Sequence, residues 1–196
     1  MQRFSLVLGA LFLLISLSNP LVAQNDAQTI QFDQLPATVE EFVALRDNLA
    51  TTPEGGAAMF VVAMITYAQN PNLGIQFFSV VLKQELLVKT ATNPNYQGLA
   101  PNHVFCLTWL EKLKQTPYLG NSYIIGTSAD AGYLLPAAPY RVFFSRHVAK
   151  AEEQVKVFVL CSGADSARPI SLQKDGEVWK VFEFSSLFVN MRSPKK

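Results

Sequence analysis

Apolar residues recur at helical spacing in the first half of the chain and alternate with polar residues in its last third. A first helix is predicted to follow Thr38, because Thr38 and Glu41 have the spacing of a capping box, in which each side chain satisfies a free backbone N–H. Its apolar side is formed by Val39, Phe42, Val43 and Leu45. The polar residues 24–36 show no period and are expected to form a flexible segment before this helix.

Two further helix starts are predicted at Thr52-Pro53 and Asn70-Pro71. Each pair places a capping oxygen before a proline, whose missing N–H costs nothing in the first helical turn. The helix after the first pair is apolar on nearly all sides, so it is expected to be the central, most buried helix. The helix after the second pair carries a broad apolar stripe that continues to Leu86.

A fourth helix is predicted over residues 102–115, and after it the period of the pattern changes. From residue 140 onward apolar and polar residues alternate, which is typical of half-buried strands. Asp175-Gly176 indicates a tight hairpin turn between two of these strands.

Helices followed by antiparallel strands predict an α+β fold, with the N-terminal helices packed on one face of a C-terminal antiparallel sheet. The chain of 196 residues shows no repeat and no second domain boundary. We therefore expect a single domain over residues 37–190, followed by a C-terminal tail at 191–196.

The N-terminal 23 residues have the layout of a secretory signal peptide. Arg3 provides a positive start, Leu6 to Leu17 form an apolar run, and Pro20 breaks that run before the small residue Ala23. The apolar run is shorter than the ~20 residues that a transmembrane helix needs. We expect cleavage after Ala23, a secreted or periplasmic protein, and no integral membrane segment in the mature chain.

Charge is balanced in the expected mature chain. The full chain has 16 Lys and Arg and 15 Asp and Glu, and removing Arg3 leaves 15 of each sign. A nucleic-acid partner would favour a basic excess, so none is expected. The sequence alone leaves open whether Cys106 and Cys161 form a disulfide or remain as two small buried residues.

The sequence contains few of the groups on which catalysis and metal binding depend. Its two histidines, His103 and His147, lack the ligand spacing of a metal site and are expected to be surface residues. No cofactor, metal or catalytic residue is therefore predicted. One alternative is an extracytoplasmic hydrolase with its site where the loops at 126–132 and 162–168 meet, in which Ser128 or Ser166 would use His147 as a base.

The second of these loops interrupts two strands with the sequence CSGADSARPI, at residues 161–170. Asp165 and Ser166 are expected to hydrogen-bond backbone N–H groups of the turn, and Arg168 either pairs with Asp165 or binds an anionic group. Asp165, Ser166 and Arg168, with Trp179 in the following hairpin, are the candidate binding residues.

Three segments carry a resemblance to a known family: TPEGGAAMFVVAM at 52–64, SGADSARPI at 162–170, and VWKVFEFSSLFV at 178–189. They resemble an uncharacterised family of bacterial proteins, a domain of unknown function, which often has proline where this chain has Ala167. The resemblance implies a recurring domain and brings no assigned activity. The last hairpin is also similar to the closing strands of cone-shaped α+β domains of the nuclear-transport-factor type, which implies a small apolar ligand between helices and a curved sheet.

The function expected from these observations is that of a secreted or periplasmic, non-enzymatic domain that binds a small ligand or a protein partner. An apolar pocket walled by Trp179, Phe144 and the central helix would favour the small ligand.

Overall fold

The structure, a computed structural model, describes residues 28–101 and 104–195. The expected signal peptide, residues 24–27, His103 and Lys196 lie outside the described residues. The helices are α1 (Val39–Leu49), α2 (Pro53–Gln69), α3 (Pro71–Val81) and α4 (Val104–Gln115), with short 3-10 turns at Gln84–Leu86, Asn121–Tyr123 and Ser185–Phe188. The strands are β1 (Gln28–Phe32), β2 (Leu87–Lys89), β3 (Leu99–Pro101), β4 (Tyr140–Ala151), β5 (Gln154–Val159), β6 (Arg168–Asp175) and β7 (Val178–Glu183).

The predicted helix starts are confirmed by their capping contacts. Thr38 accepts a hydrogen bond from the backbone N–H of Glu41 (3.2 Å), and Thr52 accepts one from Gly55 (3.1 Å). Asn70 does the same for Leu73 (3.2 Å) at the start of α3. Each cap satisfies an N–H group that the helix itself leaves free, so these three residues determine where the helices begin.

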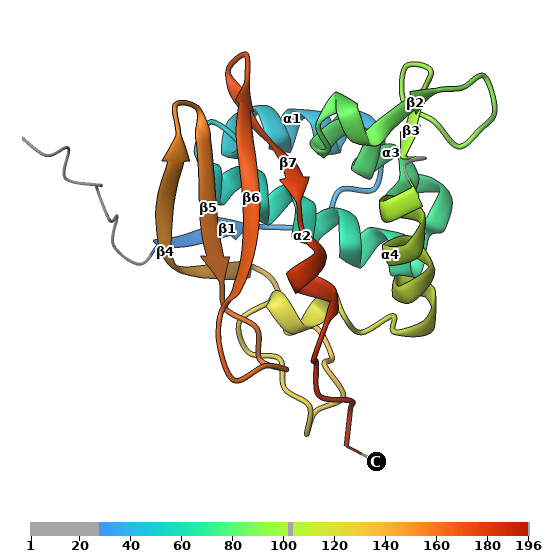
Figure 1. Ribbon diagram of the computed structural model, residues 1–196. Coiled ribbons are helices and arrows are strands. Elements are labelled where there is room, and N and C mark those ends of the chain that lie inside the picture. The colour runs from blue at the N-terminus through green and yellow to red at the C-terminus, as the bar shows by residue number, and fades with distance from the viewer. Residues whose placement is uncertain (1–27, 102–103, 196) are drawn as a thin grey trace, which may run out of the picture.

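Five antiparallel strands form one sheet in the order β1-β4-β5-β6-β7, and this sheet curls around α2 (Figure 1). The α+β fold is confirmed, and the predicted central helix is α2, in which every residue from Ala57 to Ile65 is at most 1% exposed. Strand β4 is irregular at Ser145, between its pairs to β1 and most of its pairs to β5. None of the described helices covers the outer face of the sheet (Figure 1).

The structure corrects the expected N-terminal organisation. Residues 28–32 are not a flexible segment but the edge strand β1, which pairs with the first five residues of β4. Only Ile30 and Phe32 are apolar in its alternation, so the local pattern is weak and the strand depends on pairing with a distant segment. Helix α3 also ends earlier than its apolar stripe, at Val81, and Leu86 belongs to a separate 3-10 turn.

The C-terminal tail is a second correction, because residues 191–195 pack against the domain. Lys195 donates a backbone hydrogen bond to Ala129 (2.9 Å), and Arg192 donates one to Gly163 (2.9 Å). The Tyr133 hydroxyl donates to the carbonyl of Arg192 (2.7 Å). The tail thereby holds the loops at 126–132 and 162–168 together.

The β6–β7 hairpin turn differs by one residue from the prediction. Asp175 pairs with Val178, so the two turn residues are Gly176 and Glu177, and Gly176 adopts the positive φ that such turns favour. Among the described residues, no helix has the length and hydropathy needed to cross a membrane.

Candidate functional site

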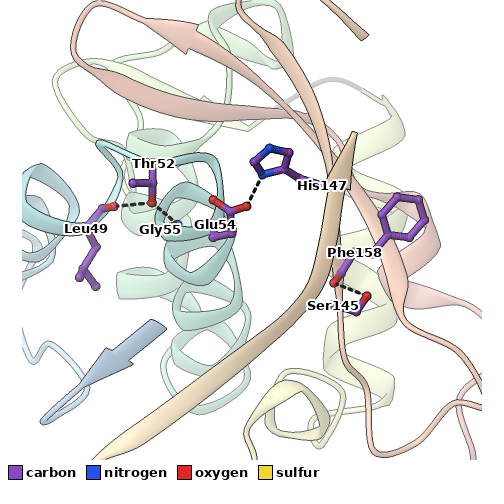
Figure 2. Close-up of polar contacts among 7 residues, drawn as sticks. All are labelled: Leu49, Thr52, Glu54, Gly55, Ser145, His147 and Phe158. Carbon is purple, nitrogen blue, oxygen red and sulfur yellow. Dashed lines mark hydrogen bonds and ion pairs between the residues drawn. The ribbon is translucent and has the colours of Figure 1, made fainter. Parts of the chain in front are cut away.

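A carboxylate and an imidazole meet between α2 and the sheet, at the start of the central helix. Glu54 is the second residue of α2 and is 4% exposed. His147 faces the helix from β4, because its cross-strand partner Val157 is part of the core. The His147 Nδ1 and Glu54 Oε1 atoms lie 2.5 Å apart (Figure 2). The expectation that His147 is a surface residue is therefore wrong, since its side chain is only 16% exposed.

Local structure places the two groups where they meet. Thr52 begins α2, and Pro53 occupies its first position, so the Glu54 carboxylate lies in the first turn, where the helix dipole favours negative charge. The irregularity at Ser145 sets the side of β4 on which the following residues lie, placing His147 on the inner face and Arg146 on the outer face. The Ser145 hydroxyl donates to the carbonyl of Phe158 (3.4 Å) (Figure 2).

A carboxylate that orients an imidazole is common to catalytic triads and to the surroundings of metal ligands. Such sites need a further nucleophile or further ligands at the other ring nitrogen. In the described part of the chain, Nε2 of His147 has no hydrogen-bond partner, and no cluster of three His, Cys, Asp or Glu residues could hold a metal. The contact that the structure does show joins β4 to α2.

The loops at 126–132 and 162–168 do meet, as the hydrolase alternative requires. The hydroxyls of Thr127 and Ser162 are 2.9 Å apart, and Ser162 also donates to the carbonyl of Ser122 (3.0 Å). Within residues 28–101 and 104–195, however, His147 hydrogen-bonds Glu54 and makes no hydrogen bond to Ser128 or Ser166. The base and the serines of the expected triad are thus not hydrogen-bonded to one another.

The candidate binding residues of the 162–170 loop contact the C-terminal segment. Asp165 forms an ion pair with Arg192, and Arg168 donates to the carbonyl of Asn190 (3.0 Å). Asp165 was expected to hydrogen-bond within its own turn, but its partner comes from the chain terminus. Ser166 is exposed beside them.

Trp179 does not join these three residues. It pairs with Lys174 near the hairpin end of β6, whereas the loop enters β6 at its other end, at Arg168. Its backbone N–H donates to Ala50 (2.8 Å), and its backbone lies against Gly56 of α2. Trp179 therefore packs the start of α2 against β7.

Replacing Asp165 by alanine is expected to lower the free energy of unfolding by less than about 1 kcal/mol, because the Asp165 carboxylate is 95% exposed and solvent screens its ion pair. Urea denaturation of the variant and the unmodified protein measures the difference. A loss of about 2 kcal/mol or more would contradict this interpretation and favour hydrogen bonds within the turn.

The two cysteines are free and buried. The Sγ atom of Cys161 lies 3.3 Å from the Ser122 hydroxyl, and the Cys106 thiol donates to the carbonyl of Leu86 at 3.8 Å. Burial raises the pKa of Cys106 to about 11, so this thiol is protonated and unreactive at neutral pH.

The interior leaves little room for a small apolar ligand. Phe144 is 1% exposed against the core, and the backbone oxygen of Trp179 and the side chain of Leu172 lie close to Gly56, so the chain is closely packed where the pocket was expected. A crevice of about 10 Å³ remains among apolar residues of α3, α4 and the C-terminal turn, enough for about one water molecule. Larger hollows, of about 320 and 300 Å³, lie on the surface around the loop at 90–98.

The outer face of the sheet combines arginine, lysine and aromatic side chains. Residues that pair across neighbouring strands share a face, and Arg146 pairs with Phe158 while Val148 pairs with Lys156. The Arg146 guanidinium carbon lies 4.2 Å from the centre of the Phe158 ring, a cation–π contact.

The same face continues across the bend of β4 to β1, where Arg141 pairs with Gln31 and Phe143 pairs with Thr29. In the described chain, Arg141, Arg146 and Lys156 have no acidic side chain within 4.0 Å. We call Arg141, Phe143, Arg146, Lys156 and Phe158 the basic aromatic face.

A single central helix wrapped by a five-stranded antiparallel sheet defines this protein as an α+β domain. A family profile described as a domain of unknown function, DUF6935, matches residues 34–195, so the chain belongs to that family. The expected membership of an uncharacterised family is confirmed, and all three segments that carried the resemblance lie within the match. No curated protein and no solved structure matches the chain.

Proposed function

We propose that this protein is an exported, non-enzymatic binding domain that docks an acidic segment of a partner protein on its basic aromatic face. The observation that carries the proposal is a group of three cations that form no ion pair within the described residues, Arg141, Arg146 and Lys156, on a sheet face that no described helix covers. Arginine and aromatic residues are enriched in protein–protein interfaces, which favours a protein partner.

Charge segregation supports an acidic partner. Many acids and bases of the chain pair with one another, but Arg141, Arg146 and Lys156 form no ion pair within the described residues. Acidic residues gather on α1, which packs on α2 and α3: Glu40, Glu41 and Asp47. Electrostatic attraction would therefore orient a negatively charged partner toward the sheet.

Export is part of the proposal and rests on the signal peptide pattern. Strand β1 begins at Gln28, so cleavage after Ala23 would leave four residues, 24–27, before the domain. The cut would thus retain the edge strand of the sheet. We do not propose the hydrolase alternative, because in the described chain neither Ser128 nor Ser166 is hydrogen-bonded to His147.

The proposal is tested with fluorescein-labelled poly-L-glutamate as a probe, whose binding to the mature protein is followed by fluorescence anisotropy at low ionic strength. Reversing two charges of the face, in Arg141→Glu/Arg146→Glu, is expected to weaken binding about tenfold or more. The matched control, Lys89→Glu/Lys112→Glu, makes the same change in net charge at exposed positions on β2 and α4.

Equal weakening by both double variants would show a response to net charge alone and contradict the proposal. Heparin and phosphatidylglycerol vesicles are tested in parallel. Tighter, face-dependent binding to either would replace the protein partner with a polysaccharide or a membrane surface.

A further inference from the structure

We infer that the partner's acidic segment joins the sheet as an additional strand along the free edge of β1, an inference that rests on the proposed function. The two edges of the sheet differ. The edge at β7 is occupied, because Trp179 donates to Ala50 (2.8 Å) and Val181 accepts from Lys83 (2.9 Å). At the other edge, nothing within residues 28–101 and 104–195 pairs with the outer side of β1.

The pairing of β4 determines which backbone groups of β1 point outward. The carbonyls of Arg141 and Phe143 accept hydrogen bonds from Ile125 (2.9 Å) and Leu160 (2.8 Å), so they point away from β1. In an antiparallel pair, residues directly opposite each other point their backbone N–H and C=O groups either toward each other or both away. Gln31 and Thr29, the partners of Arg141 and Phe143, therefore point these groups away from β4. The N–H and C=O groups of Thr29 and Gln31 are therefore available for another strand.

Strand β1 carries no blocking residue within its five positions, and the nearest charge is Asp33, directly after the strand. Natural edge strands are usually blocked by a charged residue, a proline or a bulge. The segment QTIQF has no charge and no proline, its pairing with β4 is regular, and both Thr29 and Gln31 are exposed. An edge of this kind suits a partner that contributes its own backbone, as in other complexes formed by strand addition.

The neighbouring side chains indicate the chemistry of the added strand. Outward side chains of this strand would lie beside Thr29 and Gln31, one strand away from Arg141, which favours glutamate or aspartate at these positions. Inward side chains would lie beside Ile30 and Phe32, whose exposed fractions are 8% and 3%, which favours apolar residues. The preferred segment thus alternates acidic and apolar residues.

The test uses a seven-residue peptide that alternates glutamate and valine, with binding to the mature protein measured by calorimetry. The same peptide with N-methyl groups at alternate residues keeps its charge but loses the N–H donors of one edge, and binding is expected to weaken about tenfold. Thr29→Pro removes an outward N–H and is expected to have a similar effect, whereas the control Thr29→Val keeps that donor.

The outcomes separate this inference from the proposed function. If N-methylation and Thr29→Pro leave the affinity unchanged while Arg141→Glu/Arg146→Glu reduces it, strand addition is overturned and the basic aromatic face remains. If N-methylation and Thr29→Pro reduce the affinity but Arg141→Glu/Arg146→Glu does not, strand addition at β1 is confirmed and the proposal that the basic aromatic face attracts the partner fails. If Thr29→Pro does not fold, the N-methylated peptide on the unmodified protein decides the question. Self-association that Thr29→Pro abolishes would identify a second copy as the occupant and overturn the inference.

Discussion

Replacing Glu54 by alanine is expected to lower the free energy of unfolding by about 2–3 kcal/mol, because it leaves a partly buried hydrogen-bonding group without its charged partner. The Glu54 carboxylate is 4% exposed, and its hydrogen-bond partner is the ring nitrogen Nδ1 of His147. Without the carboxylate, the imidazole would remain between helix and sheet with no protein acceptor. Equilibrium urea denaturation followed by circular dichroism measures the loss.

A double-mutant cycle separates the contact from its surroundings. His147→Ala alone is expected to be strongly destabilising, and the variant that combines both changes is expected to cost clearly less than the sum of the two. The control is Glu41→Ala, which removes an exposed acid from the first turn of α1 and is expected to cost about 1 kcal/mol. If Glu54→Ala costs no more than Glu41→Ala, the buried pair does not stabilise the fold.

The Glu54–His147 pair and the basic aromatic face belong to opposite sides of the same strand. His147 faces α2, and its neighbour Arg146 lies over Phe158 on the outer face. The irregularity at Ser145 sets this alternation, and the contact with Glu54 anchors it to the central helix. Loss of the Glu54–His147 contact is therefore expected to disturb the position of Arg146 on the outer face as well.

Local signals in the sequence were sufficient for much of the fold. A helix start depends on the capping residue and the three positions after it. The caps Thr38, Thr52 and Asn70 could therefore be predicted from the sequence alone. Strand β1 could not be predicted in this way, because its two apolar residues form a buried side only when the strand pairs with β4. The docking of the C-terminal tail likewise depends on loops that lie far away in the sequence.

The candidate site depended even more on tertiary structure. Glu54 stands in an otherwise apolar stretch, and an acid at the start of the most buried helix was the signal that a partner was needed. Nothing in the sequence connects it with His147, which is 93 positions away. The basic aromatic face was not predicted, because the balanced net charge gave no sign of it; the alternation of Arg141 and Phe143 with buried neighbours was the signal that could have found it.

Replacing Gly55 by alanine is expected to cost about 3 kcal/mol, although alanine is the better helix former. Gly55 is the third residue of α2, and a Cβ atom there would lie 1.7 Å from the carbonyl oxygen of Leu49 and 2.4 Å from its carbonyl carbon. These are backbone atoms at the end of α1, so the link between the two helices must move to admit a methyl group. Thermal unfolding followed by circular dichroism measures the destabilisation.

The control makes the opposite change, alanine to glycine, at an exposed position of α1. Ala44 is exposed, so Ala44→Gly measures the helix preference alone and is expected to cost about 1 kcal/mol. If Gly55 were subject to that preference alone, Gly55→Ala would stabilise the protein by a similar amount. A stabilised Gly55→Ala variant would therefore show that the approach of α1 to α2 is looser than the structure has it. A destabilised variant would confirm that the end of α1 lies close against the first turn of α2, which carries Glu54.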